Sequence, residues 1–564
     1  MSTLVVPGVS VQAQFDPLPP LPAPSGILGA VGIVDRPPAA GGLVSVSKVS
    51  ELRDQLGPGT QSSMAEVVHA LSNGVSEAVI SAVAGGGAAS LPLLNIESKP
   101  CVTLRCRSRG AWGNSLRAEI RALTNSSGVI VRVSLRLLRN GITEESFQDL
   151  QVRPGAPDDL FETINQQSRL VVAVDPGFAN LLPADNTYAF DDVGTPIDVP
   201  ETGGGGRVIM QLLPAAGIQS SGLSARLAVA DNLVNVQVFQ AGLQEEFDKL
   251  TLNPDSADYL PYVLLTKSRF LRARTTDSLP DGKRLPVGTT APLPFTNGTS
   301  PTVQQYRDAI DLLADDPRID LVLASVEPGR SDDDTRTIHQ ALVAHAVTMA
   351  DNGAPRIAFG SVSIAEQPDL GLIRDHAATA RNRRFVLVSP SGAEGAVAGL
   401  VGRLNQQDSP TFKPVPLFGI PAARYRESEL NRLLGPAINL CVVQDRAGHG
   451  VVVLKGIDTT GDQISVTRVA DEAIRETKAI AEIFIGQLNS EQSRTALKQQ
   501  IVATFTRMER AGALVKSTDG ADPAFVVDVY STQQDFAQGI VRVEIAVRPV
   551  RAIDYVYATI RVKN

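Results

Sequence analysis

The sequence is poor in the residue types that disulfide, metal and stacking chemistries require. It holds three cysteines, Cys101, Cys106 and Cys441, which are too few and too unevenly spaced for a disulfide framework, so we expect a reducing compartment. No histidine or second cysteine pair near Cys101 and Cys106 completes a zinc ligand set. With 5% aromatic residues and one tryptophan, the chain does not supply the exposed rings on which single-stranded nucleic acids stack.

Positive charge and long apolar runs are also lacking. The formal net charge is -8 at pH 7 and the pI is near 5.4, so direct binding to nucleic acid is not expected. No apolar run approaches the roughly 18 residues of a membrane span, and the N-terminus lacks the basic and apolar regions of a signal peptide. We therefore expect neither membrane insertion nor signal-peptide-dependent secretion.

The motifs of common catalytic sites are missing or incomplete. There is no G-x-x-x-x-G-K-[ST] phosphate loop and no G-x-S-x-G nucleophile elbow. The stretch "GILGAVG" at 26–32 imitates a dinucleotide fingerprint, but its spacing is wrong and prolines follow it, so it predicts close packing. The histidines are scattered without catalytic or metal-ligand spacing and are predicted to be surface or core residues: His69, His339, His345, His376 and His449. The sequence thus predicts no catalytic, cofactor-binding or metal-binding residue.

Two further stretches each have two readings. The stretch "VSPSGAEG" at 388–395 ends a strand and begins a helix, so it could hold an anion, although an ordinary turn explains it as well. The run "RSDDDT", with Asp332 to Asp334, could attract Ca²⁺, but its place before a helix favours capping and a match to the helix dipole.

The pattern along the chain predicts a mixed α/β, multidomain protein. At 564 residues it exceeds the roughly 250 to 300 residues at which a single core stops growing. Strands alternate with helices between about 301 and 405, which predicts a mostly parallel sheet. We expect a strand arm with a proline-rich tether at 1–24, an α/β segment at 25–100, one or two β-rich inserted outer domains at 101–290, an α/β domain at 291–438 and a C-terminal domain at 439–564.

The C-terminal domain is predicted to hold strands, two helices and further strands. The stretches "INLCVVQD", "GVVVLKGID" and "QISVTRV" are expected as strands. A helix at about 467–486 buries an apolar stripe, while Arg468, Arg475 and Lys478 are expected to face away from it. A second helix starts near Ser490 and ends at Gly512. The stretches "AFVVDVY", "IVRVEIAV" and "DYVYATIRVKN" then predict three strands.

Strand-like segments stand at both ends of the chain. The opening run "TLVVPGVSVQAQ" precedes a proline-rich stretch that cannot supply a partner strand, so it must either find a sheet elsewhere or stay unpaired. Such end segments are suited to adding a strand to a neighbouring molecule. The residues expected to do so are Leu4, Val5, Val6, Val9 and Val11 in the N-terminal arm and Tyr555, Val556, Tyr557, Ile560 and Val562 in the C-terminal arm.

In their order, these segments resemble the sheath proteins of contractile phage tails and contractile injection systems. "VPGVSVQ", a proline-rich stretch and "GILGAVGIVDRPP" are similar to the sheath N-terminus, and "RSRGAWGNSLRAEI" to the opening of an inserted domain. "GHGVVVLKGIDTT", "ISVTRVADEAI", "RMERAGAL" and "QGIVRVEIAVRPVRAIDYVYATIRV" follow the sheath C-terminal pattern. The chain departs from that pattern at Leu454, where many sheaths carry tryptophan, and at Thr467 and Arg468, where an Arg-Arg pair is common.

The resemblance implies a structural polymer without enzymatic activity or cofactor. Subunits of such sheaths form stacked hexameric rings around an inner tube and contract to drive the tube into a target, with baseplate and terminal cap proteins as further partners. Their end arms add strands to neighbouring subunits. Assembly in the bacterial cytoplasm, as part of a phage tail or a tail-like particle, is implied as well.

The resemblance also places the C-terminal domain innermost, which makes Arg468, Arg475 and Lys478 candidate tube-facing residues. A solvated helix face is the other reading of these three cations. For the chain as a whole, the alternatives are a non-contractile tail, baseplate or collar protein and an α/β nucleotide-binding enzyme.

Overall fold

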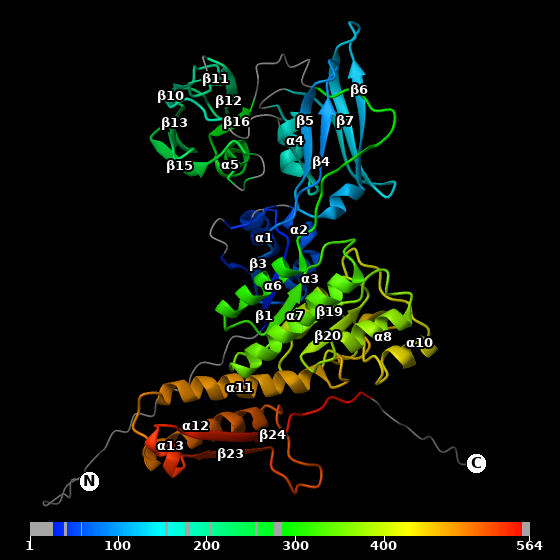
Figure 1. Cartoon of the computed structure of the whole chain (residues 1–564), viewed down its shortest axis with the longest axis vertical. Helices are drawn as coiled ribbons and strands as arrows, with labels where there is room; N and C mark the ends of the chain where they lie inside the picture. Colours follow the sequence, from blue (N-terminus) through cyan, green and yellow to red (C-terminus); the bar gives the residue numbers. More distant parts are fainter. Residues whose placement is uncertain are drawn as a thin grey trace, which may run out of the picture.

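The computed structural model describes residues 26–35, 37–38, 42–57, 59–152, 156–174, 181–203, 206–253, 256, 258–275 and 285–554. The elements are arranged in three tiers (Figure 1): two β-rich units at one end, an α/β body in the middle and a C-terminal domain at the other end. The fold is therefore a mixed α/β, multidomain one, as the sequence predicted.

The body is built on one eight-stranded sheet whose strands come from distant parts of the chain. Its order is β2-β3-β1-β18-β19-β20-β21-β22, and the six strands from β3 to β21 run parallel. Gly29 of β1 lies between Val79 of β3 and Val322 of β18, so the N-terminal segment and the later half of the chain share one sheet. The strands are β1 Ile27–Gly32, β2 Val44–Val46, β3 Glu77–Ala82, β18 Leu321–Ala324, β19 Ile357–Ser361, β20 Phe385–Ser389, β21 Cys441–Arg446 and β22 Gly450–Val453.

Helices cover both faces of this sheet, because alternate residues of each buried strand point to opposite sides. Val31 and Leu387 belong to one core, and Ala30 and Val388 to the other. The helices are α1 Val49–Leu56, α2 Thr60–Ser63, α3 Ala65–Asn73, α6 Val303–Leu312, α7 Asp332–Asp351, α8 Leu370–Thr379, α9 Glu394–Arg403 and α10 Glu427–Leu433, with a 3₁₀ turn at Leu313–Asp315.

The first turn of α7 decides between the two readings of the "RSDDDT" run. The Ser331 hydroxyl accepts a hydrogen bond from the main-chain N–H of Asp334 at 3.2 Å, so serine is the N-cap. The three aspartates occupy the first turn, where negative charge is favourable to the helix dipole.

The upper tier consists of two outer units with separate apolar cores. The first outer unit holds β4 Ser90–Leu94, β5 Pro100–Cys106, a 3₁₀ turn at Ala111–Ser115, β6 Leu116–Thr124, β7 Ile130–Arg139, β8 Ile142–Leu150, α4 Leu160–Gln167, β9 Val171–Val174 and β17 Leu293–Pro294. The second holds β10 Asn186–Ala189, β11 Ile197–Pro200, β12 Val208–Pro214, β13 Ser224–Ala230, β14 Leu233–Gln240, β15 Leu243–Leu250, α5 Leu260–Lys267 and β16 Leu271–Thr275. Cys101 and Cys106 are buried in the first core, as small core residues.

The two outer units repeat one structural pattern, and matching residues lie 100 positions apart. The Ser168 hydroxyl donates to Glu145 at 2.6 Å, and the Ser268 hydroxyl donates to Glu245 at the same distance. Each of these carboxylates also accepts a main-chain N–H, from Arg169 and from Arg269 respectively. The sequence signal is the pair of segments "EESFQDL" and "QEEFDKL", followed by "SRL" and "SRF" at the same spacing. The upper tier therefore contains an internal repeat that the sequence analysis did not detect.

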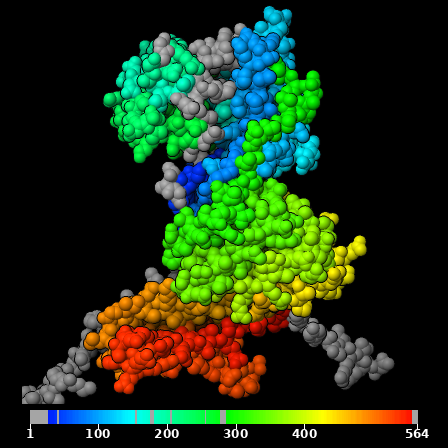
Figure 2. All heavy atoms as spheres, in the orientation of Figure 1, coloured from blue at the N-terminus to red at the C-terminus, as the bar shows by residue number. Residues whose placement is uncertain are grey.

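A narrow neck joins the upper tier to the body (Figure 2). Gly87 bridges Thr299 and Ser90 bridges Thr296, both in antiparallel sense, so the chain enters and leaves the tier side by side. Between β9 and β17 the chain makes the whole second unit, and β17 then pairs with β6 of the first. The second unit is thus nested in the first, and the first is nested in the body.

The C-terminal domain consists of α11 Ile464–Phe484, α12 Glu491–Arg510, β23 Phe525–Tyr530, α13 Gln533–Ala537 and β24 Arg542–Val547. The strand predicted at "QISVTRV" is wrong, because Ile464 begins α11. The side chain of Ile464 is 1% exposed and packs in the body core, and this burial outweighs the β propensity of the segment. The stretches at 441–453 are strands as predicted, but they pair with the body sheet through Val388 and Cys441.

No helix in the described ranges is long and apolar enough to cross a membrane.

Candidate functional site

The hairpin of the C-terminal domain has two outer edges with which no other described strand pairs. β23 and β24 form a two-stranded antiparallel sheet in which Val527 pairs with Ile545. One face packs on α12, where the rings of Phe505 and Phe525 lie 5.6 Å apart. On the other face Val526 is 54% exposed. A hairpin that is fixed by a helix and open at its edges can accept a further strand.

The residues predicted to form the strand-donating arms lie outside the described residues. They are Leu4, Val5, Val6, Val9 and Val11 at one end and Tyr555, Val556, Tyr557, Ile560 and Val562 at the other. The described chain runs from β24 to the start of α11, where Arg551 pairs with Asp462 at 2.7 Å and the N–H of Ala552 donates to Gln463 at 2.9 Å. The last described residues therefore lie beside the first turn of α11.

Two of the three candidate tube-facing cations lie between α11 and the body. Arg468 is 5% exposed and donates to the main-chain carbonyl of Leu404 at 3.0 Å. Arg475 is 9% exposed and donates to the carbonyls of Ile319 and Pro355. Both side chains lie opposite the apolar stripe that packs on α12, as predicted, but they are not exposed as a solvated or tube-facing surface would be, because each reaches main-chain carbonyls at the end of a body element.

Lys478 is exposed, and its ammonium donates to the carbonyl of Asn352 at 3.1 Å. Its side chain passes close to Gly353, where a Cβ atom would lie 2.9 Å from the Lys478 Cδ. Of the three cations, Lys478 alone keeps the exposed position that a tube contact requires, and that contact stays a prediction.

The contact between α11 and the body, which is called the seam below, also contains carboxylates. Asp471 of α11 pairs with Arg384 at 2.9 Å. Asp320 accepts hydrogen bonds from the N–H groups of Gly26 and Ile27 at 2.9 and 2.8 Å. Burial raises the pKa of Asp471, and the Arg384 charge and hydrogen bond oppose that rise. The seam is therefore an ionic contact that joins α11, the body and the start of β1.

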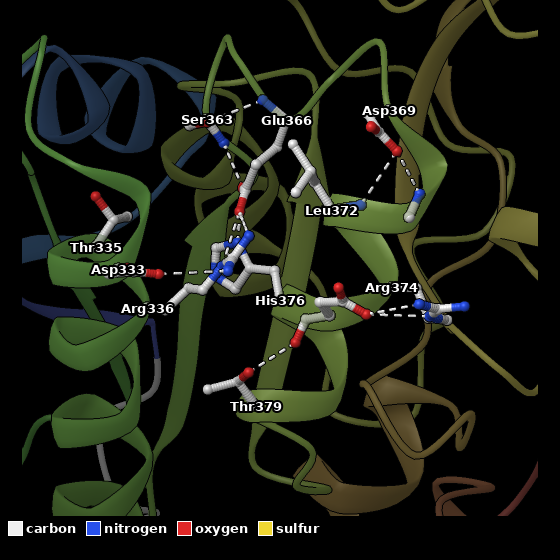
Figure 3. Close-up of polar contacts among 12 residues, drawn as sticks. Asp333, Thr335, Arg336, Ser363, Glu366, Asp369, Leu372, Arg374, His376 and Thr379 are labelled. Atoms are coloured by element: carbon white, nitrogen blue, oxygen red, sulfur yellow. Dashed lines mark hydrogen bonds and ion pairs between the residues drawn. The ribbon is translucent and has the colours of Figure 1, made fainter.

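A buried polar cluster links α7 to α8. His339 Nδ1 lies 2.8 Å from His376 Nε2. His376 Nδ1 lies 2.8 Å from Glu366 Oε2, and Figure 3 shows these two residues beside Arg336. Arg336 of α7 pairs with the same glutamate at 2.7 Å, and the N–H of Ser363 donates to it at 3.0 Å. The sequence analysis missed this cluster because its members stand 10 to 37 positions apart, which matches no ligand or catalytic spacing.

Burial and hydrogen bonding determine the protonation states in this cluster. Burial, together with the smaller effect of the neighbouring His376, lowers the pKa of His339 to about 3. Burial acts to raise the pKa of Glu366, but its hydrogen bond and charge interaction with His376, together with Arg336, bring that pKa down to about 2. His339 is thus neutral and Glu366 ionised at neutral pH. The contact between His339 of α7 and His376 of α8 joins the two helices through buried side chains.

No group of three or more histidine, cysteine, aspartate or glutamate side chains among the described residues is arranged to hold a metal ion.

Comparison with known proteins identifies the C-terminal domain. Residues 458–563, from the turn before α11 through the C-terminal arm, match the family model of the phage tail sheath C-terminal domain. This match confirms the resemblance to tail sheath proteins that the sequence indicated. No curated protein sequence matches the chain.

Three solved structures with some likeness are also sheath proteins. A sheath tail protein of Desulfitobacterium hafniense is 14% identical, with 97% of each chain covered and a TM-score of 0.46. A sheath tail protein of Listeria innocua is 11% identical, with 94% of this chain and 93% of that chain covered and a TM-score of 0.43. The helical sheath of the anti-feeding prophage in its contracted state is 16% identical, with 49% of this chain and 78% of that chain covered and a TM-score of 0.36.

Proposed function

We propose that this protein is the sheath subunit of a contractile tail or contractile injection system. Its subunits assemble as stacked hexameric rings around an inner tube, and the assembly contracts to drive the tube into a target. The observation that carries this proposal is the match of the C-terminal domain to the tail sheath family, in a domain whose hairpin is open at both edges.

Strand addition is the proposed linkage between subunits. The N-terminal and C-terminal arms of different subunits lie along the outer edges of β23 and β24 of a neighbour. A strand of about five residues makes roughly four main-chain hydrogen bonds, each with a net contribution of about 0.5 to 1.5 kcal/mol, partly offset by the cost of ordering the arm. One such link is weak, but a lattice in which every subunit gives and receives links is strong.

The remaining parts have structural roles in this proposal. The domain at 439–564 faces the tube, the α/β segments at 25–100 and 291–438 form the ring, and the insert at 101–290 lies outermost, with 1–24 as a tethered arm. Inner tube, baseplate and terminal cap proteins are the partners, and the particle assembles in the bacterial cytoplasm. The subunit uses no enzymatic activity, cofactor, nucleic acid or membrane insertion.

Electron microscopy of the purified chain tests the linkage. We expect a variant without residues 3–12 to stay folded but to form no long tubes. Val556→Pro removes a main-chain donor from the C-terminal arm and should reduce tube yield far more than Lys563→Ala. Tubes of normal length from the truncated protein, or equal yields from the two substitutions, would contradict the linkage. Closed rings without tubes from the unmodified chain would indicate a collar or baseplate protein.

Lys478 tests the proposed contact with the tube. Lys478→Glu should weaken tube-filled extended particles at low salt and leave empty contracted sheaths intact, because an exposed charge acts over a distance that salt shortens. Lys516→Glu is the control with the same change of charge elsewhere in the C-terminal domain. Equal behaviour of the two variants would remove Lys478 from the interface.

A further inference from the structure

A cavity of about 420 Å³ lies at the carboxyl-terminal edge of the body sheet. Its walls come from the segments that follow β18, β19 and β20 and from the first turns of α7 and α9. Figure 3 shows Thr335 and Ser363, two residues that line it. In parallel sheets this edge is where ligands bind, because loops from neighbouring strands converge there.

Two carboxyl groups from different helices share one wall of this cavity. Glu66 belongs to α3 and Glu394 to α9, and the two helices cross at backbone contact: a Cβ atom on Gly395 would lie 1.9 Å from the carbonyl oxygen of Glu66. The crossing holds the main chains of the two helices close together at these residues. Glu394 is 5% exposed, and its Oε2 has no hydrogen-bond partner among the described residues. A buried acceptor of this kind is costly unless a donor reaches it.

The other charged groups that face the cavity leave this pair without a cation. Arg330 is held by Glu327 at 2.6 Å and Asp334 at 3.1 Å. His339 lines the cavity as a neutral ring, because burial lowers its pKa to about 3. Asp332 adds a further carboxylate.

The pKa values of both carboxyl groups are raised. Burial raises the pKa of Glu394 to about 8, and the neighbouring Glu66 contributes to the rise. Burial also raises the pKa of Glu66, although the charge of His69 on α3 opposes this. His69 Nε2 lies 2.8 Å from the carbonyl oxygen of Phe418, while its Nδ1 has no hydrogen-bond partner among the described residues. At neutral pH the pair therefore retains a proton.

The rest of the wall is largely apolar and includes Val326, Val362 and Ile364. A cavity of this size with a carboxyl pair at one wall and hydrocarbon beside it matches a ligand with a positive head and a carbon body. We propose that this cavity binds a small organic cation, a primary aliphatic ammonium, whose N–H groups donate to Glu66 and Glu394 while its carbon chain contacts the valine and isoleucine side chains. This site is independent of the proposed sheath function.

Thermal unfolding and calorimetric titration of the full chain with n-butylammonium chloride test the site. We expect a saturable rise in the unfolding temperature and measurable heat of binding at neutral pH. The uncharged n-butanol should give neither, because the carboxylates recognise the ammonium group. A similar response to butanol, no response to butylammonium, or a response to Mg²⁺ alone would overturn the proposal.

Substitutions locate the binding. Glu394→Gln should weaken butylammonium binding by about tenfold or more, since glutamine cannot release a proton to form the carboxylate that accepts the charge-assisted hydrogen bond. Glu66→Gln is a second variant with the same expected loss, and Glu427→Gln, at a carboxylate with 76% side-chain exposure on α10, should bind like the unmodified chain. Glutamine imitates the protonated carboxyl group, so both cavity variants should fold. Undiminished binding in both cavity variants would overturn the proposal, as would an equal loss in Glu427→Gln.

Discussion

Arg384, the residue before β20, forms an ion pair with Asp471 in the middle of α11 at 2.9 Å. The side chains are 14% and 10% exposed, so the pair lies in a nearly dry contact between the body and the C-terminal domain. The same guanidinium donates to the carbonyl of Arg356 at 3.2 Å. The pair thus attaches α11 to the sheet and not only to a neighbouring side chain.

Asp471→Ala should destabilise the contact between α11 and the body. Removal of one partner of a buried pair leaves the other charge uncompensated, at a cost of about 3 to 5 kcal/mol when burial is complete and somewhat less here. Urea unfolding measures the loss in overall stability, and hydrogen exchange of the main-chain amides of α11 measures the local loss. Asp375→Ala removes an exposed pair with Arg374, at 59% and 54% exposure, and should change stability by less than about 0.5 kcal/mol. Similar losses in both variants would contradict the structural role of the seam.

The internal repeat predicts matched effects in the two outer units. Ser168→Ala and Ser268→Ala each remove the hydroxyl that links a partly buried carboxylate to the turn after a helix, so each should cost about 1 to 3 kcal/mol of local stability. Hydrogen exchange should show the loss in the first unit for one variant and in the second unit for the other. Loss in only one of them would mean that the shared geometry does not carry the same energy.

The buried histidine predicts acid sensitivity. The pKa of His339 is about 3 in the folded chain and 6.5 in its usual state, so between these values the unfolded chain binds a proton that the folded chain does not. Stability therefore falls as the pH drops from about 6.5 toward 3, with a slope near 1.4 kcal/mol per pH unit from this group. His339→Gln should flatten this dependence, while His449→Gln, at an exposed position, should not. Chemical unfolding at several pH values measures the free energy of unfolding. Equal slopes of this free energy against pH in the two variants would refute the prediction.

The crossing of α3 and α9 predicts intolerance to one methyl group. Gly395→Ala places a Cβ atom 1.9 Å from a main-chain oxygen that cannot rotate away, so we expect a loss of at least about 2 kcal/mol. Gly42→Ala is the control, because no atom lies within 4 Å of the added carbon. The free energy of unfolding of the two variants should differ by most of that loss. A tolerated alanine at 395 would mean that the helices separate readily.

Local sequence patterns predicted the helices and strands of the body. They did not predict the features that depend on contacts between distant segments. The alternation of strands and helices after residue 301 reports on main-chain conformation and burial, which neighbouring residues determine. The expected exposure of Arg468 and Arg475 failed because their acceptors are carbonyls such as Leu404 and Ile319, which no helical period reveals. The carboxyl pair of Glu66 and Glu394 was hidden for the same reason, since it forms only where two helices cross.

The second outer unit could have been recognised from the sequence as a repeat of the first. Its glutamate, phenylalanine, leucine and serine recur at a constant spacing of 100 residues, and a comparison of the chain with itself would have found them. The weak periodicity of short strands concealed this repeat, because each strand contributes few alternating positions. In contrast, Val388 opposite Cys441 could not be foreseen, since pairing of strands far apart in sequence depends on the whole sheet.

The two-stranded neck at Gly87 and Thr299 makes the upper tier an exchangeable module. Because the chain leaves the body and returns to it at neighbouring points, a different domain could be grafted there, or the tier shortened to a turn, without rerouting the eight-stranded sheet. The same geometry would let natural variation remodel the upper tier while the body and the C-terminal domain stay unchanged.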